Sequence, residues 1–156
     1  MIKDSRAYLY AKWCVQCGNR KVGKYVKLQA RKWLQIADGK HKEAYVSEKS
    51  YKKICKLLKL MVHPDLQCSM YEGLEDYAWL LIVVVFCTRR REDDRRFYQT
   101  ALLEIARKNF KTFNSAVIFI LGMLTEPRFS RFFSVAPDFK LSSELRLAVR
   151  KIIKVS

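Results

Sequence analysis

The stretch "KTFNSAVIFILGML" at residues 111–124 decides how this chain can fold, because a helix drawn through it is apolar on nearly every side. A short apolar run precedes it, "YQTALLEIA" at residues 98–106, and another follows it, "SRFFSVAP" at residues 130–137. Both runs are predicted to be strands. An amphipathic helix is predicted to begin at Ser142 or Ser143. This order of strand, helix, strand and helix predicts a parallel pair joined by a right-handed crossover.

The region before residue 65 is predicted to consist of helices joined by short polar turns. Residues 24–37 have the period of an amphipathic helix. Its predicted apolar side consists of Tyr25, Val26, Ala30, Trp33, Leu34 and Ala37. Its predicted basic side consists of Lys24, Lys27 and Arg31, which are candidate DNA contacts. A second amphipathic helix, at residues 47–62, is predicted to end at His63-Pro64, and we interpret His63 as a surface or capping residue.

A predicted linker at residues 65–73 separates this helical region from the rest of the chain. Residues 74–87, which contain the longest apolar stretch at Ala78–Cys87, are predicted to be a buried helix, although their β-branched run would also suit a strand. The apolar part is about half of the ~20 residues that a membrane-spanning helix needs. The mixed-charge run at residues 88–97 is predicted to be an exposed loop. The predicted domains are therefore residues 1–64 and residues 65–156.

The charge of the chain restricts its partners. With 31 Lys and Arg against 15 Asp and Glu, the 156-residue chain has a formal net charge of +16. Such a balance favours nucleic acid, nucleotides or acidic proteins. The N-terminus lacks the pattern of a signal peptide, which predicts a cytoplasmic protein with no membrane partner. The five cysteines are predicted to be reduced thiols, and Cys14-x-x-Cys17 lacks the second ligand pair of a structural zinc site.

The residues between the first predicted strand and the apolar helix resemble a phosphate-binding loop. Such a loop places backbone amides and a Lys at the phosphates and a Ser or Thr hydroxyl at Mg²⁺. Against the pattern G-x-x-x-x-G-K-[ST], Lys111 and Thr112 match, while Ile105 and Phe110 occupy the two glycine positions. The pattern alone leaves open whether this is a nucleotide site or an ordinary basic turn.

The loop more closely resembles the variant found in large terminase subunits, the ATP-driven motors that package DNA into tailed-phage heads. That variant commonly has the form "RKNGKT", and here the sequence is Arg107-Lys108-Asn109-Phe110-Lys111-Thr112. The segment "YEGLEDYAWLLI" at residues 71–82 resembles the aromatic segment that contacts adenine in this family, and "FFSVAPD" at residues 132–138 resembles its second strand. The resemblance covers roughly residues 70–156.

The resemblance implies a fold, ligands and roles. The fold is α/β or α+β, in which a helical N-terminal region leads into the start of a P-loop-type parallel sheet. The cofactors are ATP and Mg²⁺, bound by residues 107–112, with Thr112 holding the metal. Tyr77 and Trp79 are the adenine-contact candidates, since Ala78 lies where a Gln is common. The implied partners are nucleotide, double-stranded DNA, the small terminase subunit and the portal, in the cytoplasm of the host cell.

Two features of the family are missing from the sequence. No apolar strand ends in Asp-Glu, the pair that holds Mg²⁺ and activates water, and no aspartate-rich nuclease region is present. The chain thus resembles the N-terminal part of a large terminase subunit, whether a truncated gene, a prophage remnant or a fragment. Its status as an enzyme is left open, with ATP binding expected and turnover not. The alternative is a non-enzymatic basic module that binds DNA or a protein partner.

Overall fold

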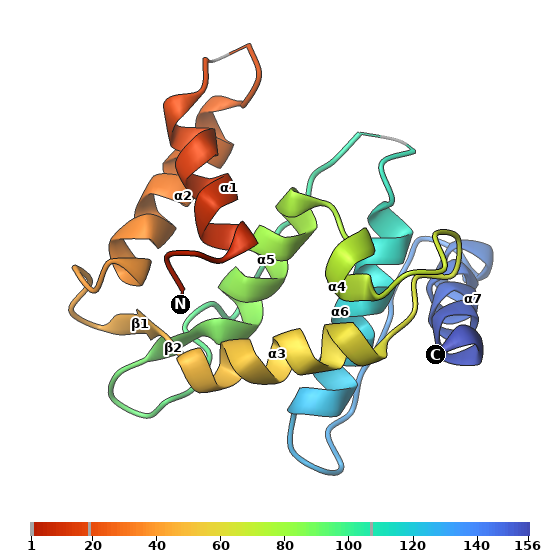
Figure 1. Ribbon diagram of the computed structural model, residues 1–156. Coiled ribbons are helices and arrows are strands. Elements are labelled where there is room, and N and C mark those ends of the chain that lie inside the picture. Colours follow the sequence, from red (N-terminus) through yellow and green to blue (C-terminus); the bar gives the residue numbers. More distant parts are fainter. Residues whose placement is uncertain (1, 19, 107) are drawn as a thin grey trace. The chain divides into compact units, whose positions relative to one another are not determined.

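The computed structural model describes residues 2–18, 20–106 and 108–156, and most of them are helical (Figure 1). In these residues the elements are α1 (Arg6–Gln16), α2 (Lys24–Ala37), β1 (Ala44–Val46), α3 (Glu48–Leu60), α4 (Met70–Gly73), α5 (Asp76–Cys87), β2 (Thr88–Arg90), α6 (Lys111–Thr125) and α7 (Phe139–Val155). The two strands form one antiparallel sheet. The fold is α+β, which confirms the coarser of the two predicted classes.

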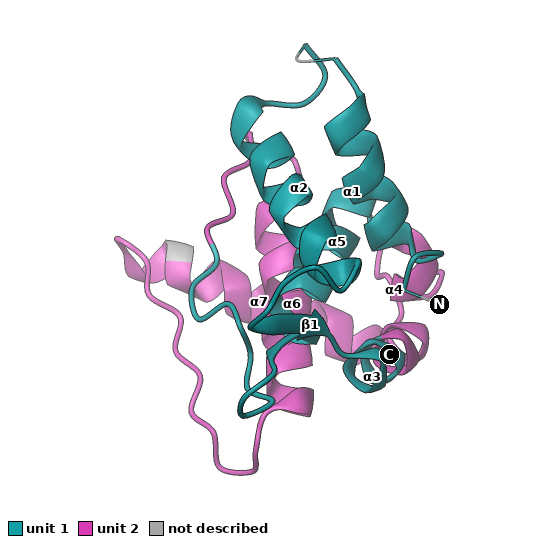
Figure 2. Cartoon of the chain, turned by 90° about the vertical axis from the view of Figure 1, so that its left-hand side faces the viewer, with its two compact units in different colours: residues 1–54, 74–101 teal, residues 55–73, 102–156 magenta. Residues whose placement is uncertain are grey.

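The chain forms two compact units that do not follow the sequence in order (Figure 2). Unit 1 consists of residues 1–54 and 74–101, and unit 2 of residues 55–73 and 102–156. The predicted domain boundary after residue 64 falls inside unit 2. The two units alternate along the sequence because α5, from the middle of the chain, packs against α1 and so belongs to the N-terminal helical unit.

Unit 1 is built around α1, α2 and α5. Trp33 of α2 and Trp79 of α5 are each 1% exposed, and Val83 is fully buried. The indole Nε1 of Trp33 donates to Oγ1 of the buried Thr88 at 3.1 Å. Residues 76–87 are helical, as predicted, despite their β-branched run. Burial of this segment, which packs against α1, outweighs the weak intrinsic preference of Val and Ile for strands.

The short sheet of unit 1 was not expected. Residues 88–97, predicted to be a loop, begin with β2, which pairs with β1 through the register Ala44↔Arg90 and Val46↔Thr88. After the strand the charges of the run pair locally, with Arg90 Nη2 at 2.7 Å from Asp93 Oδ2. Three-residue strands give too few alternating positions for a period of two to be recognised in the sequence.

The predicted apolar side of α2 is only partly buried. Ala30 and Trp33 are buried as expected, but Tyr25 is 74% exposed and Val26 is 48% exposed. The side chain of Lys27 donates to the carbonyl of Cys17, the C-cap residue of α1. The first turn of α2 is thus bonded to the end of α1, while Tyr25 in the same turn extends into solvent.

Unit 2 is built around α6 and α7, which pack against each other. Helix α6 buries Ala116, Val117, Ile120 and Leu121, as its apolar sequence predicts. Helix α7 begins at Phe139, three to four residues before the predicted start. Ile152 is its buried apolar anchor, with 1% exposure.

The predicted parallel strand pair of unit 2 is absent from the described residues. Residues 101–106 and 131–136 have no regular secondary structure. Several of their apolar side chains lie in solvent, with Leu102 88%, Phe133 80% and Val135 92% exposed. A strand is defined by its hydrogen-bonded neighbours, and a single parallel pair without further strands has too little stabilisation to form. The described residues thus have the α+β class without the predicted parallel pair.

Candidate functional site

The loop predicted to bind phosphate lies in unit 2 and ends where α6 begins. Arg107, its first residue, lies outside the described residues, whereas Lys108, Asn109 and Phe110 are exposed. Lys108 and Phe110 both have left-handed backbone conformations, with φ of 65° and 55°. Phe110 is the N-cap residue of α6, and its carbonyl accepts a hydrogen bond from the backbone N–H of Asn114 at 2.8 Å. The residue just before the helix thus has a backbone conformation that side chains rarely adopt.

Phe110 occupies the position of a glycine in the phosphate-loop pattern, and its backbone conformation is one that glycine adopts without penalty. For a residue with a side chain, the left-handed conformation costs roughly 1–2 kcal/mol. The side chain of Phe110 is 57% exposed, so the ring extends largely into solvent. The loop therefore has a glycine-like backbone at this position in spite of its bulky residue.

The first turn of α6 is open to solvent. Lys111 and Thr112 are both exposed, and the side chain of Phe110 makes no capping hydrogen bond. The first N–H groups of a helix have no partner within the helix, and they carry a partial positive charge. An anion can bind such N–H groups directly, and the ammonium of Lys111 would add a full positive charge.

Thr112 also lines a pocket of about 320 Å³ in unit 2. The other lining residues are Pro64, Asp65, Phe113, Glu144, Leu147, Ala148 and Lys151. Lys151 Nζ lies 2.6 Å from Asp65 Oδ1 across this pocket. The hydrogen bond from Lys151 holds the pKa of Asp65 below its ordinary value. The pocket thus combines the Thr112 hydroxyl with two carboxylates, one of which is neutralised by a lysine.

His63 packs against Phe113 in the first turn of α6 and is not the surface residue that we expected. It is 6% exposed, and its ring centroid lies 4.6 Å from that of Phe113. Its Nδ1 accepts hydrogen bonds from the backbone N–H groups of Asp65 and Leu66, at 3.3 and 3.2 Å. Burial lowers the pKa of His63, which favours the neutral imidazole. The neutral ring is the form whose Nδ1 can accept both bonds.

Sequence analysis did not identify the residues that surround Thr112 in this pocket. Asp65 and Lys151 are 86 positions apart in the chain and belong to a turn and to α7. Neither belongs to a motif, and a lone acidic or basic residue has no periodic signal. The helical periodicity of α7 places Glu144 and Lys151, seven residues apart, on one side of that helix. It does not indicate which other element these side chains face.

The adenine-contact candidates Tyr77 and Trp79 lie in α5, in unit 1. Tyr77 is half-buried, whereas Trp79 is 1% exposed and belongs to the core. The guanidinium carbon of Arg6 lies 5.8 Å from the ring centroid of Trp79. Of the two aromatic side chains, Tyr77 is the more accessible to a ligand. The assignment of both residues to adenine stays a prediction.

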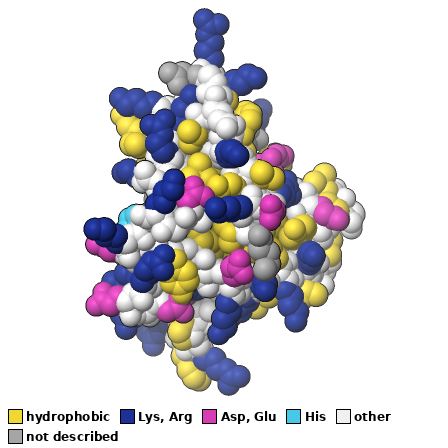
Figure 3. Space-filling view, turned by 60° about the vertical axis from the view of Figure 1, so that its left-hand side comes forward, with side chains coloured by type: hydrophobic (Ala, Val, Ile, Leu, Met, Phe, Trp, Pro, Cys, Tyr) yellow, Lys and Arg dark blue, Asp and Glu magenta, His cyan; other side chains and the backbone are white. Residues whose placement is uncertain are grey.

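The DNA-contact candidates on α2 are not equivalent in the structure. Lys24 and Arg31 are exposed, but Lys27 is half-buried and donates to the carbonyl of Cys17. A cation at this place stabilises the C-terminus of α1. Lys and Arg side chains are spread over the face of the molecule seen in Figure 3, with hydrophobic side chains between them. Lys24 and Arg31 are therefore the two candidates whose charges are most accessible to a polyanion.

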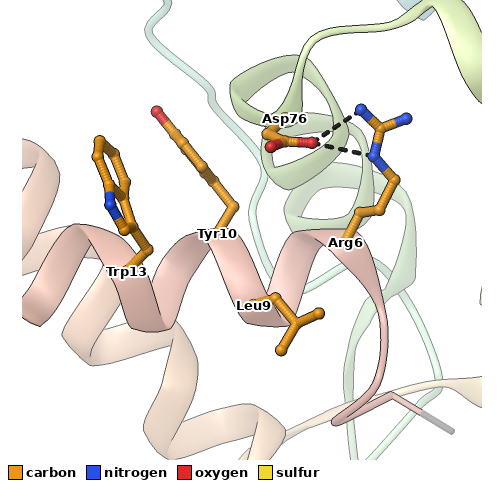
Figure 4. A pocket seen from close by; sticks show the side chains of 5 residues that line it. All are labelled: Arg6, Leu9, Tyr10, Trp13 and Asp76. Atoms are coloured by element: carbon orange, nitrogen blue, oxygen red, sulfur yellow. Dashed lines mark hydrogen bonds and ion pairs between the residues drawn. The ribbon is translucent and has the colours of Figure 1, made fainter.

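A second pocket, of about 520 Å³, lies in unit 1 between α1 and the start of α5. Its lining residues are Arg6, Leu9, Tyr10, Trp13 and Asp76 (Figure 4). Tyr10 and Trp13 stack with their ring centroids 5.5 Å apart, and Arg6 Nη2 lies 2.8 Å from Asp76 Oδ1. Burial raises the pKa of Tyr10 to about 12, so its hydroxyl stays protonated at neutral pH.

The cysteines and the membrane question can be stated briefly. Cys14 is buried, and Cys17 Sγ lies 3.4 Å from the carbonyl oxygen of Cys14. Within residues 2–18, 20–106 and 108–156, His, Cys, Asp and Glu side chains form no group of three or more that could hold a metal ion. Among the same residues, every helix is too short or too polar to cross a membrane.

Comparison with protein-family models, with curated proteins and with solved structures gave no match.

Proposed function

We propose that the loop at residues 107–112 binds ATP with Mg²⁺, and that the chain is the N-terminal part of a large terminase subunit. The observation that supports this most directly is the backbone of Phe110. It has the left-handed conformation of a glycine immediately before an exposed helix start that carries Lys111 and Thr112. This conformation costs free energy for a residue with a side chain.

Each residue of the loop has a role in this proposal. The amides at the start of α6 and the ammonium of Lys111 bind the phosphates, and the hydroxyl of Thr112 is the ligand for Mg²⁺. Mg²⁺, when bound with the nucleotide, neutralises phosphate charge. Lys108 and Asn109 are exposed and border the phosphate position. Arg107 completes the resemblance to the terminase variant.

We further propose that residues 98–106 and 130–137 belong to a parallel sheet of the P-loop type when additional strands are present. The exposure of Leu102, Phe133 and Val135 supports this proposal. Apolar side chains in solvent gain free energy when a neighbouring strand or helix covers them, at about 25 cal/mol per Å².

Calorimetric titration of the chain with ATP and MgCl₂ tests the loop. We expect weak binding, with a dissociation constant from the high micromolar to the millimolar range, or roughly 4–6 kcal/mol. Lys111→Ala should abolish it. Lys49→Ala, at an exposed lysine of α3, removes the same charge elsewhere and is the matched control. Equal binding by wild type and Lys111→Ala would show that this loop is not the nucleotide site.

Binding is expected without turnover. Hydrolysis needs an acidic residue that positions a water against the γ-phosphate, and the sequence has no apolar strand ending in Asp-Glu. A steady-state assay on purified protein should therefore give background rates. ATPase activity above background that Lys111→Ala removes would contradict this expectation and would direct attention to the carboxylates of Asp65 and Glu144 beside Thr112.

The second candidate function is binding of double-stranded DNA by α2. Helix α2 has no acidic residue, and Lys24, Arg31 and Lys32 are exposed. Each phosphate that the protein neutralises adds about 0.9 to the slope of log affinity against log salt. Lys24→Glu combined with Arg31→Glu should flatten the slope. Binding that does not change between low and high salt would exclude this function.

A further inference from the structure

Tyr25 is the most exposed aromatic side chain in any helix of unit 1. The sequence pattern grouped it with Trp33 among the apolar residues of α2, yet it is 74% exposed while Trp33 is 1% exposed. Leu28, one turn further on, is 43% exposed. An aromatic ring kept in water on a well-formed helix loses the free energy that burial would give it, and such a ring is a common feature of binding surfaces.

The charged residues of α2 around Tyr25 are all cationic. Lys24 Nζ lies 5.5 Å from the centroid of the Tyr25 ring. Lys32 lies seven residues after Tyr25, which places it on the same side of the helix about 10.5 Å along the axis. Arg31 and Lys32 are exposed, and no residue of α2 carries a negative charge. We call Lys24, Tyr25, Leu28, Arg31 and Lys32 the α2 face.

Two side-chain hydrogen bonds fix helix α2, which carries the α2 face, to other parts of unit 1. Lys27 donates to the Cys17 carbonyl at the end of α1, and Trp33 donates to Thr88 from the buried side of the same helix. The face therefore belongs to a helix that is fixed at its first turn and at its middle. A ligand that binds there does not have to order the helix first, which removes an entropic cost of binding.

We propose that the α2 face binds single-stranded nucleic acid, with an unpaired base stacked on Tyr25 and the flanking phosphates at Lys24, Arg31 and Lys32. This proposal rests on the second candidate function, since it uses the same basic helix, and it names the form of nucleic acid. Proteins that bind single strands without sequence preference combine a cationic track with exposed aromatic rings, because every base has a π-face.

The Tyr25 ring is the feature that would give a single strand a higher affinity than a duplex. In a duplex the bases already stack on one another, so an aromatic ring on a helix surface gains little beyond contact with the backbone. Lysines and arginines without the ring would bind both forms through phosphate alone. A preference for the single strand that depends on Tyr25 is therefore the specific consequence of this arrangement.

Fluorescence anisotropy with the 156-residue chain tests the proposal. The probes are labelled 20-nucleotide oligo-dT and oligo-U, and a 20-base-pair duplex, each titrated at several salt concentrations. We expect Tyr25→Ala to weaken binding of the single strands about tenfold and binding of the duplex less than twofold. The salt slope should not change, because no charge is removed. Tyr25→Phe keeps the ring and should bind like wild type.

Two controls make each outcome decisive. Lys24→Ala should lower the salt slope for the single strands and for the duplex by roughly 0.7 to 0.9 while retaining the dependence on Tyr25. The melting temperature of Tyr25→Ala should equal that of wild type, because the side chain is exposed. Equal loss of affinity for both forms, or no loss, would overturn the single-strand proposal alone. Absence of binding to all probes at low salt would overturn this proposal and the second candidate function together.

Discussion

Units 1 and 2 differ in where their large apolar side chains lie. In unit 1, Trp33 and Trp79 are each 1% exposed, and they lie in helices α2 and α5. In unit 2, Leu102, Phe129 and Phe133 are 88%, 98% and 80% exposed, and all three lie outside helices and strands. Large apolar side chains are thus buried in these helices of unit 1 and exposed in the irregular segments of unit 2.

This difference shows that apolar composition does not bury a segment unless regular elements are available to cover it. Unit 1 has α5, whose apolar sequence fills the space beside α1. In unit 2, residues 102–106 and 131–136 precede and follow α6 in the sequence, and neither segment has regular secondary structure. The proposed phosphate loop follows the first of these segments directly, so the candidate site lies in the less completely packed unit.

The largest effect is expected in the core of unit 1. Trp33→Ala should lower the free energy of unfolding by about 3–5 kcal/mol, because it removes a fully buried ring and leaves Thr88 Oγ1 without its indole donor. Urea unfolding monitored by circular dichroism measures it. The free energy of unfolding of Trp33→Phe, which keeps most of the ring volume but not the N–H donor, should lie between those of wild type and Trp33→Ala. A loss below about 1 kcal/mol for Trp33→Ala would mean that unit 1 is not well packed.

Adjacent phenylalanines of unit 2 sharpen the comparison. The ring of Phe132 packs on Phe119 with centroids 5.5 Å apart, and it lies so close to Gly122 that a Cβ there would be 3.0 Å from a ring carbon. Phe132→Ala should cost about 1–2 kcal/mol, since this ring is half-buried. Phe133→Ala should change stability by less than about 0.5 kcal/mol.

The same urea unfolding experiment measures both variants. If Phe133→Ala destabilised the protein as much as Phe132→Ala, the extended segment would be covered in solution, and the contrast between the units would fail. Sedimentation of both variants at several protein concentrations would then show whether a second copy supplies the cover.

The effect of His63 on stability is smaller and depends on pH. Burial holds its pKa below the ordinary value of 6.5, so between these two values the unfolded chain binds more protons than the folded chain. The free energy of unfolding therefore rises with pH in this window. The contribution is fully present above the unfolded pKa and is lost as the pH falls toward the folded pKa. The charges beside the ring, Asp65 and Lys151, act in opposite directions on its pKa.

Urea unfolding at pH 5 and pH 7.5 tests this expectation. His63→Asn is the matched variant, because an amide oxygen can accept the N–H groups of Asp65 and Leu66 but does not titrate in this range. Wild type should lose more stability than His63→Asn on acidification. Equal losses of stability in wild type and His63→Asn would contradict the role assigned to the His63 ring.

The smallest effect is expected at the loop itself. Phe110→Gly removes the cost of a left-handed phenylalanine, roughly 1–2 kcal/mol, and adds the entropic cost of glycine, roughly 0.5–1 kcal/mol. The net change in stability should be a gain of about 1 kcal/mol or less. Affinity for ATP with Mg²⁺ should stay equal or rise, because the backbone conformation is kept. A clear loss of stability would mean that the ring makes contacts that its exposure does not suggest.

Sequence periodicity by itself determined the long helices. Residues 24–37, 76–87 and 111–125 are helical where the sequence predicted them, because helical spacing or a continuous apolar run favours a helix over many residues. The loop motif at residues 107–112 was also found in the sequence, and its proposed function stays a prediction. These features depend on residues near one another in the chain.

Only the tertiary structure decided which apolar residues are buried and which distant residues meet. Tyr25 and Trp33 both belong to the predicted apolar side of α2, but Trp33 is 1% exposed and Tyr25 is 74% exposed. Asp65 and Lys151 meet beside Thr112 through contacts between segments that no local pattern relates. Residues 98–106 and 130–137 have the composition of strands, yet strands form only when a neighbour supplies the hydrogen bonds. Local propensity acts within a segment, whereas burial and strand pairing depend on partners that the segment itself does not specify.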